Sequence, residues 1–508
     1  MEKCLKTNVL VKEVLFSDSA EQPIDIDFTL PDYCKEISRI FKCHSAPRIS
    51  SKSINGKNIT VEGVVTITLL YAALNGELCS YEYQYPFSKT FEASCDCVGM
   101  NLVCKAKNQY LNCRAITGRK VDIHGAVGIY VSITKRKSTE IVSDYDDKNV
   151  ELKRGMAAAT VPMGSAEKYI LIEEEIDIGQ GQPQIRNVWR SDVKACVKET
   201  KVINDKAVIK GEIKVCIIYC SDSTPNPQSV KTTIPFSQIL DIEGITDSCA
   251  CDTKAEVVFF EIKPRISASG ETKSFSLTAK LLLNSEAYCS NEIPVIFDAF
   301  SRKYEADIKK TNVVFERITQ NISENYHCKK AITFDEEISS VVDLWCNIEE
   351  CHTKFENENM IVYGTVLAAI IVCDTKNIPI YHEKQIEFEH KFPLDIASNL
   401  HCEPQIEVTS CGFTITSTTS MELMVDILLN AAVYQKSNVT LISEMNVDTK
   451  KPCKNTNRTA LTIYFCGAGE CVWDIARIYN ASVEEIMAIN ELENEQLENG
   501  KMILVPII

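Results

Sequence analysis

Three stretches of the chain share one pattern of apolar and polar positions. Each begins with alternating residues, contains a single glycine near its start and ends in an apolar run; they are residues 58–71, 206–219 and 359–372. Alternation with a period of two places every second side chain on one face, which is typical of a strand with one buried face. The stretches lie roughly 150 residues apart, so the sequence predicts three copies of one β-rich unit.

Other landmarks recur in the same register. A polar turn precedes each stretch, and Asn55-Gly56 in the first copy is a strong hairpin signal, because a tight hairpin turn needs positive φ at both central residues. A phenylalanine follows each stretch, and a second alternating run ends each copy. The phenylalanines are Phe87, Phe236 and Phe388, and the runs are 121–133, 275–288 and 421–434. Landmarks that stay in register through three copies indicate true internal repeats.

We therefore expect a mainly β protein with three sandwich- or barrel-like repeats, because several short strands at regular spacing are typical of those architectures. Each copy is long enough to bury its own core. The predicted repeats span 1–160, 161–310 and 311–445. Short helices are expected near the start of the first two, because residues 36–41 and 185–189 carry apolar side chains three or four positions apart.

The pattern changes after residue 445. Residues 446–460 lack apolar periodicity and are rich in lysine and asparagine, which predicts a polar linker. Residues 461–508 predict a small α+β module in the order strand, helix, helix, strand. The signals are alternation over 461–465, helical spacing of Val472, Ile475, Ala476 and Tyr479, a capping box over 482–485, and a closing strand over 502–507.

The terminal module resembles a LysM domain. Residues 469–477 read GECVWDIAR, similar to the family opening G-D-T-L-W-x-I-A, and the later positions up to Val505-Pro506 match the rest of the family pattern. The resemblance implies a groove for N-acetylglucosamine-containing glycan between two loops. The positions that match this groove are Gly469, Glu470, Cys471 and Val472 on one side and Ile489, Asn490 and Glu491 on the other, with Trp473 either stacking on a ligand or packing in the core.

Two features of the module favour a protein partner over a glycan on the same face. Glu470 and Cys471 replace the family's Asp and Thr, and a thiol is a weaker hydrogen-bond donor than a hydroxyl. Residues 461–508 also contain eight acidic residues against Arg477 and Lys501. Many peptidoglycans are anionic, so this charge does not help glycan binding.

The repeats resemble the SPOCS domain of endospore-forming bacteria. The resemblance is carried by Leu30-Pro31-Asp32, by the V-x-G-x-V strand that ends in Tyr71, and by Pro86-Phe87-Ser88; the third copy has Val372 and Glu387 where the Tyr and the Pro would stand. SPOCS repeats followed by a LysM domain are similar to the SipL-like family of clostridial spore-morphogenesis proteins. This implies a non-enzymatic adaptor in spore coat assembly and forespore encasement. Such an adaptor would work in the mother-cell cytoplasm at the forespore surface, and its LysM domain would dock on the coat ATPase, stage IV sporulation protein A. The alternative is a peptidoglycan-binding LysM protein of the cell envelope.

Composition agrees with a cytoplasmic location. Charged residues interrupt the first 27 positions, so we expect no signal peptide, and no apolar window is long enough to predict a membrane span. The 23 cysteines are then expected to be mostly free thiols in a reducing compartment. The net charge of −16 argues against nucleic acid as a partner.

No catalytic or metal chemistry is expected. Cys95-x-Cys97 and Cys249-x-Cys251 have a C-x-C spacing, whereas structural zinc sites use four ligands at wider spacing. The sequence contains no P-loop and no H-E-x-x-H pattern. The repeats and the linker fill residues 28–460, so the sequence leaves no room for a separate catalytic domain. We expect no enzyme activity, no metal and no cofactor.

Overall fold

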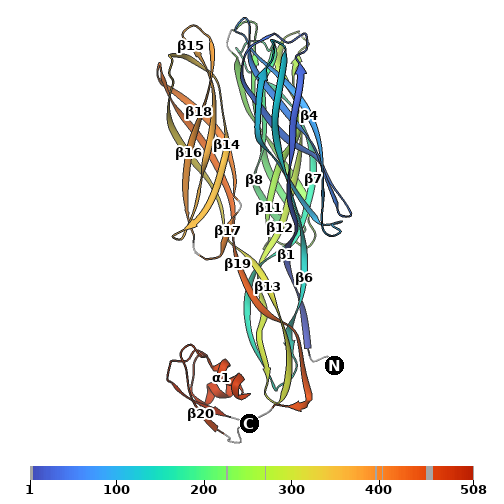
Figure 1. Cartoon of the computed structure of the whole chain (residues 1–508), viewed down its shortest axis with the longest axis vertical. Helices are drawn as coiled ribbons and strands as arrows, with labels where there is room; N and C mark the ends of the chain where they lie inside the picture. Colours follow the sequence, from blue (N-terminus) through green and yellow to red (C-terminus); the bar gives the residue numbers. More distant parts are fainter. Residues whose placement is uncertain are drawn as a thin grey trace.

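The computed structural model describes residues 4–224, 227–268, 270–394, 398–402, 404–453 and 461–506. Strands dominate it, and they follow one another in three similar sets before a small terminal domain (Figure 1). The first set is β1 (Cys4–Thr29), β2 (Ile37–Asn55), β3 (Asn58–Ala73), β4 (Leu78–Glu92), β5 (Asn101–Ala115) and β6 (Lys120–Tyr145). The second is β7 (Val150–Asp177), β8 (Asn187–Ile203), β9 (Lys206–Cys220), β10 (Gln228–Asp241), β11 (Ala250–Ile266) and β12 (Thr272–Ser301). The third is β13 (Tyr304–Thr333), β14 (Ile338–Glu356), β15 (Asn359–Asp374), β16 (Pro379–Pro393), β17 (Leu400–Cys402), β18 (Gln405–Ser417) and β19 (Ser420–Pro452).

Each set forms a unit of two packed antiparallel sheets. One sheet is the meander β2-β3-β4, β8-β9-β10 or β14-β15-β16. In the other sheet the last strand of the unit lies between the first strand and the strand that precedes it, as in β1-β6-β5. Residues from both sheets share one apolar core in every unit. The prediction of three mainly β, sandwich-like repeats is therefore confirmed.

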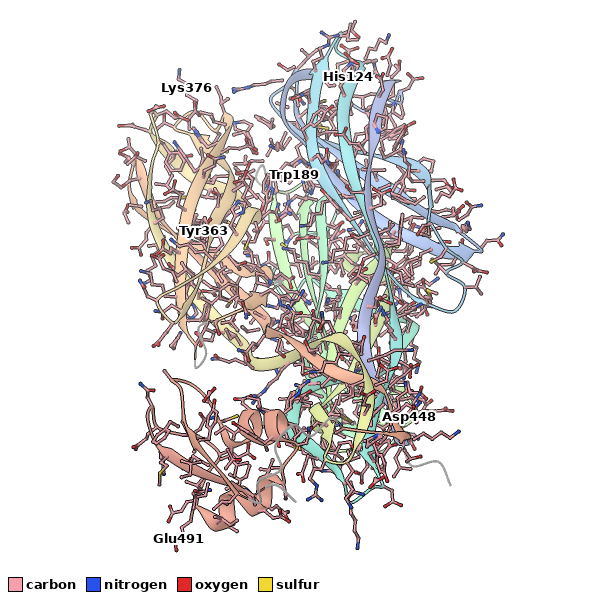
Figure 2. All side chains as sticks on the ribbon, turned by 60° about the horizontal axis from the view of Figure 1, so that its bottom comes forward. His124, Trp189, Tyr363, Lys376, Asp448 and Glu491 are labelled. Carbon is pink, nitrogen blue, oxygen red and sulfur yellow. A yellow bond between two sulfur atoms is a disulfide. The ribbon has the colours of Figure 1, made fainter. Side chains whose placement is uncertain are left out.

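The first and last strands of each unit are much longer than the sandwiches require. Their outer parts leave the sandwiches as two-stranded ribbons, and the three ribbons pack together (Figure 1). We call this region the stalk; it comprises residues 4–14, 134–145, 150–161, 289–301, 304–318 and 434–452. Its core contains Val9, Ile141, Phe315 and Leu441, drawn from the first and third units, and Val295 from the second. At the opposite end, Trp189 lies where the three sandwiches meet (Figure 2).

The stalk changes the predicted boundaries. The chain passes from one unit to the next at the stalk end, in the short connections 146–149 and 302–303. The predicted boundaries after residues 160 and 310 therefore fall inside β7 and β13. The predicted linker 446–460 is also wrong over residues 446–452, which continue β19; residues 454–460 lie outside the described part of the chain.

The conserved spacing of glycine and phenylalanine landmarks has a direct structural cause. Gly63 lies opposite Phe87 in the β3–β4 ladder, and a Cβ at Gly63 would lie 2.4 Å from the Phe87 ring and 2.3 Å from the Arg48 carbonyl oxygen. Gly211 faces Phe236 in the same way. Gly364 is paired with Phe388 in the third unit. In the first two units the absent side chain gives the ring its place over the strand, whereas a Cβ at Gly364 would meet the Glu350 carbonyl oxygen at 2.1 Å.

The helices expected over 36–41 and 185–189 do not form. Residues from Ile37 belong to β2, and Trp189 lies in β8. The register of β2 shifts between Ile37 and Arg39 and again between Ile40 and Lys42. Each such β-bulge adds one residue and reverses the alternation, so apolar side chains three apart can face the same core. The bulges therefore imitate helical spacing in the sequence.

Candidate partner-binding face of the terminal domain

The terminal domain has the expected strand, helix, helix, strand order. β20 (Leu461–Phe465) pairs with β21 (Met502–Pro506), and α1 (Val472–Tyr479) and α2 (Val483–Ile489) follow β20. The Ser482 hydroxyl accepts from the Glu485 backbone N–H at 3.4 Å, which confirms the predicted cap of α2. The core of the domain contains Val472, Ile475, Ala476, Ile486, Ile503 and Val505. Ile507, placed in the closing strand from the sequence, lies outside the described residues.

Glu470 fixes the loop before α1. Its carboxylate accepts hydrogen bonds from the Tyr464 hydroxyl at 2.9 Å and from the Gly467 N–H at 2.8 Å. The hydrogen bond to this carboxylate also raises the pKa of Tyr464. Glu470 therefore holds the loop in place through hydrogen bonds within the domain.

The Asp474 side chain, in the first turn of α1, fixes the position of Cys471. The Asp474 carboxylate accepts from both the Cys471 N–H and its thiol, each at 3.0 Å. Burial, reinforced by the Asp474 carboxylate, raises the pKa of the Cys471 thiol, so the group stays protonated at neutral pH. The residue acts as a helix cap and as a small core side chain.

The second side of the predicted groove is also internally bonded. The Asn490 side chain donates to the carbonyl oxygens of Ile486 at 2.8 Å and Leu504 at 2.7 Å, and accepts from the Leu504 N–H at 2.8 Å. Val472 N–H donates to the Glu495 carbonyl at 2.9 Å, which joins the two loops directly. Most polar groups of the predicted groove are therefore committed to the fold.

Trp473 points out of the LysM domain and into the stalk. Its indole Nε1 donates to Asp298 at 3.1 Å, and its ring meets Phe300 edge-on at a centroid distance of 5.1 Å. Arg477, one helical turn later, also pairs with Asp298. Only 4% of Trp473 remains exposed. The sequence left open whether this tryptophan stacks on a ligand or packs in the core, and the structure places it in a contact between domains.

Asp298 is a contact residue of the candidate site that the sequence did not reveal. Burial opposes ionisation of this carboxyl, but hydrogen bonds from Lys310 and Trp473 and the charge of Arg477 outweigh burial and hold its pKa below the usual value. Lys310 Nζ lies 2.8 Å from the second carboxylate oxygen. Asp298 lies 175 positions before Trp473, and no local pattern links the two.

The predicted groove residues thus divide into two groups. Cys471, Val472 and Trp473 are buried, while Glu470 and Asn490 are partly buried and bonded within the domain. Gly469, Ile489 and Glu491 are exposed, and Glu491 lies at the outer edge of the domain, away from the stalk (Figure 2). The exposed remainder is one apolar side chain, one carboxylate and one glycine. It presents few polar donors to a sugar.

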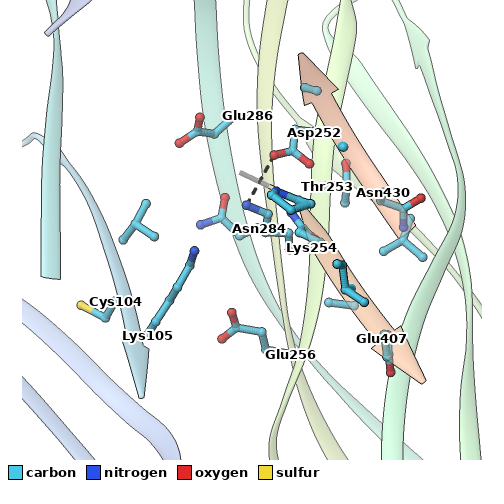
Figure 3. A pocket seen from close by; sticks show the side chains of 18 of the residues that line it. Cys104, Lys105, Asp252, Thr253, Lys254, Glu256, Asn284, Glu286, Glu407 and Asn430 are labelled. Carbon is cyan, nitrogen blue, oxygen red and sulfur yellow. Dashed lines mark ion pairs between the residues drawn. The ribbon is translucent and has the colours of Figure 1, made fainter. Parts of the chain in front are cut away.

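A separate cavity of about 2640 Å³ lies among the three sandwiches (Figure 3). Its lining mixes both charges: Lys254 pairs with Asp252 at 3.4 Å, while burial raises the pKa of Glu256 and of Glu407. Across the described ranges, no group of three His, Cys, Asp or Glu side chains is arranged to hold a metal ion. We assign no chemistry to this cavity.

The cysteine motifs differ in their structure. Cys249 forms a disulfide with Cys289, whereas Cys95, Cys97 and Cys251 are free thiols. The other cysteines of the chain are free as well, and many are buried. The equivalent C-x-C positions of the first two units are therefore not used in the same way.

Comparison with known proteins identifies two kinds of domain. The family model described as "SipL, SPOCS domain" matches residues 36–116 and 184–264, and the LysM domain model matches residues 467–506. The chain thus carries two SPOCS domains followed by a LysM domain. This is a SipL-like architecture, and the resemblance stated from the sequence is confirmed. No curated protein and no solved structure matches the chain.

The third unit was expected to be a SPOCS-like repeat. The SPOCS model matches the first two units, and the third unit shares their strand order and the glycine–phenylalanine pairing. It has Val372 at the position of Tyr71 and Tyr219, whose hydroxyls donate to the carbonyl oxygens of Lys35 and Pro183.

Neither helix of the described residues is long and apolar enough for a transmembrane segment.

Proposed function

We propose that this chain is a non-enzymatic adaptor in endospore coat assembly and forespore encasement. In this proposal its LysM domain docks on the basement-layer coat ATPase, stage IV sporulation protein A, in the mother-cell cytoplasm at the forespore surface. SPOCS and LysM domains together support a sporulation-associated scaffold. Both are binding domains, which supports a role without catalysis.

One observation carries the choice of a protein partner over a glycan. The predicted groove of the LysM domain uses its own polar groups internally, through Glu470, Cys471 and Asn490. Sugar recognition depends on a few well-placed polar groups that are free to bond the ligand. The exposed part of the face is centred on Ile489, which is 46% exposed. An apolar side chain beside carboxylates supports a protein partner that presents an apolar and basic surface.

The test is a binding measurement on the full-length chain. The immobilised protein is offered the purified coat ATPase or purified peptidoglycan, and Ile489→Asp is compared with the unmodified chain. Ile478→Asp is the matched control, since Ile478 is a 61% exposed α1 residue outside the predicted face. We expect the ATPase to bind, Ile489→Asp to lose most of the affinity and Ile478→Asp to retain it. Failure of the ATPase to bind the unmodified chain would overturn the proposal.

The second candidate is a peptidoglycan-binding protein of the cell envelope. The LysM match favours it, because such domains commonly bind N-acetylglucosamine-containing glycans. It predicts capture of peptidoglycan with no need for the ATPase. Binding to peptidoglycan alone in the same experiment would replace the adaptor proposal with this one.

A further inference from the structure

A β-bulge in β12 orients the stalk residues that contact the LysM domain. The register of β12 against β7 shifts between Ile296 and Asp298, so Phe297 is an extra residue. Ile296 and Ala299 consequently both pack in the stalk core, although they are three positions apart. Asp298 and Phe300 are turned to the other face, where the LysM domain lies.

The space for this bulge is supplied by a glycine. A Cβ at Gly155, on the adjacent strand β7, would lie 2.3 Å from the Phe297 ring. The extra residue is thus accommodated by a missing side chain on its neighbour. The bulge and the glycine together fix the direction in which Asp298 points.

Several groups on the stalk end meet complementary groups on the LysM domain. Phe300 completes the LysM core cluster and packs against Trp473. Asp298 accepts from Trp473 and Arg477. Glu151 lies near the start of α2: burial and the Glu484 carboxylate raise the pKa of this carboxyl, whereas Arg302 and the Val483 backbone N–H lower it. The contact therefore combines aromatic packing with charge-assisted hydrogen bonds from α1.

The LysM domain nevertheless has a core of its own. Ile475, Ile486, Ile503 and Val505 are fully buried, and all of them belong to the domain itself. The contact to the stalk is a small addition to this core, carried mainly by one ring pair and one carboxylate. Interfaces between domains of one chain generally resemble transient interfaces unless they are large and hydrophobic.

We propose that the stalk end is an internal docking surface for the LysM domain, and that it competes with the external partner for the Trp473 side of that domain. The inference deepens the proposed function and rests on it, because the partner proposed there would use both sides of the predicted face: Ile489 stays exposed in the docked domain, while Trp473 is covered. When the domain is docked, Trp473 is covered by Asp298 and Phe300. A partner that needs this surface binds only the released fraction, so its apparent affinity is reduced by that fraction.

The first measurement requires no partner. Hydrogen–deuterium exchange with mass spectrometry follows residues 472–489 in the full-length chain, in Asp298→Asn and in Phe300→Ala. Asp307→Asn is the control, because it makes the same charge change at an exposed stalk position. We expect exchange in α1 and α2 to accelerate several-fold in the first two variants and to stay unchanged in the control. Equal exchange in all four proteins would overturn internal docking.

The second measurement adds the coat ATPase to the same four proteins. Release of the docked domain should tighten binding by Asp298→Asn about tenfold, equivalent to about 1.4 kcal/mol, and leave the Asp307→Asn control at the unmodified affinity. Faster exchange with unchanged ATPase affinity would overturn the competition. Absence of ATPase binding in every protein would overturn the proposed function, while the exchange data alone would still decide whether internal docking occurs.

Discussion

Arg190 of the second unit donates two hydrogen bonds to the carboxylate of Asp343 in the third unit. Its Nε lies 2.7 Å and its Nη2 3.2 Å from the two carboxylate oxygens. Side-chain exposure is only 13% for Arg190 and 4% for Asp343, and the guanidinium also lies 4.8 Å from the centre of the Trp345 ring. The pair therefore joins two units in a site from which water is largely excluded.

Removal of one partner should destabilise this junction strongly. Asp343→Ala leaves a buried guanidinium without its counter-charge, and a change of this kind typically costs about 3–5 kcal/mol. We expect a correspondingly lower free energy of unfolding in a urea titration followed by circular dichroism. Glu444→Ala, which breaks an exposed stalk pair with Lys309, is the control and should have little effect. Equal stability of the two variants would contradict a structural role for the Arg190–Asp343 pair.

The glycines of the repeat should not tolerate a methyl group. In Gly63→Ala the new Cβ collides with the Phe87 ring and with the Arg48 carbonyl oxygen, and the backbone oxygen cannot rotate away. Overpacking of this kind costs about 1–3 kcal/mol, so a lower melting temperature is expected. Gly412→Ala provides the comparison, because its Cβ would meet only Met424 at 3.8 Å. A thermal scan that gives both variants the same midpoint would refute the steric explanation.

Asn490 should behave as a structural residue. Asn490→Ala removes three hydrogen bonds and leaves the Leu504 N–H and carbonyl without their side-chain partner. The expected loss is about 1–3 kcal/mol of LysM stability, measurable as faster hydrogen exchange in β21. Gln496→Ala, at an exposed side chain, should leave that exchange unchanged. If Asn490→Ala weakens partner binding and leaves exchange in β21 as it was, the residue belongs to the binding face instead.

Glu256 should make the protein less stable at neutral pH than at mildly acidic pH. Burial raises the pKa of this cavity carboxyl, whereas Lys52, Lys254 and Lys105 favour its ionised form and Glu167 opposes it. A carboxyl whose pKa is higher in the folded chain than in the unfolded chain binds its proton more tightly when folded. Its contribution to the free energy of unfolding therefore falls as the pH rises from the unfolded-state pKa to the folded-state pKa. Glu256→Gln should therefore be more stable than the unmodified chain at pH 7. The difference in free energy of unfolding between the two proteins should vanish at pH values below the usual carboxyl pKa. A difference that stays constant at all pH values would contradict a raised pKa of Glu256 in the folded chain.

The structural features that could be predicted from the sequence are those that depend on the local pattern of residues. The three strand stretches, the Gly63 and Phe87 landmarks and the helix cap at Ser482 are each encoded by residues close together in the chain. Their pairing in the structure follows from alternation and turn chemistry. The sandwich class and the LysM domain were predictable for the same reason.

The stalk and the docked LysM domain were not predictable. β12 runs as one strand from its sandwich part into its stalk part, and a register shift between Ala287 and Tyr288 breaks the alternation at the junction, so the pattern does not show that both parts belong to one strand. The bulges near Ile37 and Phe297 reverse the alternation and so disguise which face is buried. The contact between Asp298 and Trp473 depends on tertiary structure alone.

The route of the chain through the stalk has an evolutionary consequence. Each unit leaves and returns at the same end of the molecule, and a connection of only a few residues leads into the next unit. Duplication of a whole unit in a gene would therefore add a complete sandwich with both of its ribbon strands, and only one short turn would have to be created. A lineage can lengthen such a protein one unit at a time, and each new copy is then free to diverge from the others, as Val372 differs from Tyr71 and Tyr219 at the same position.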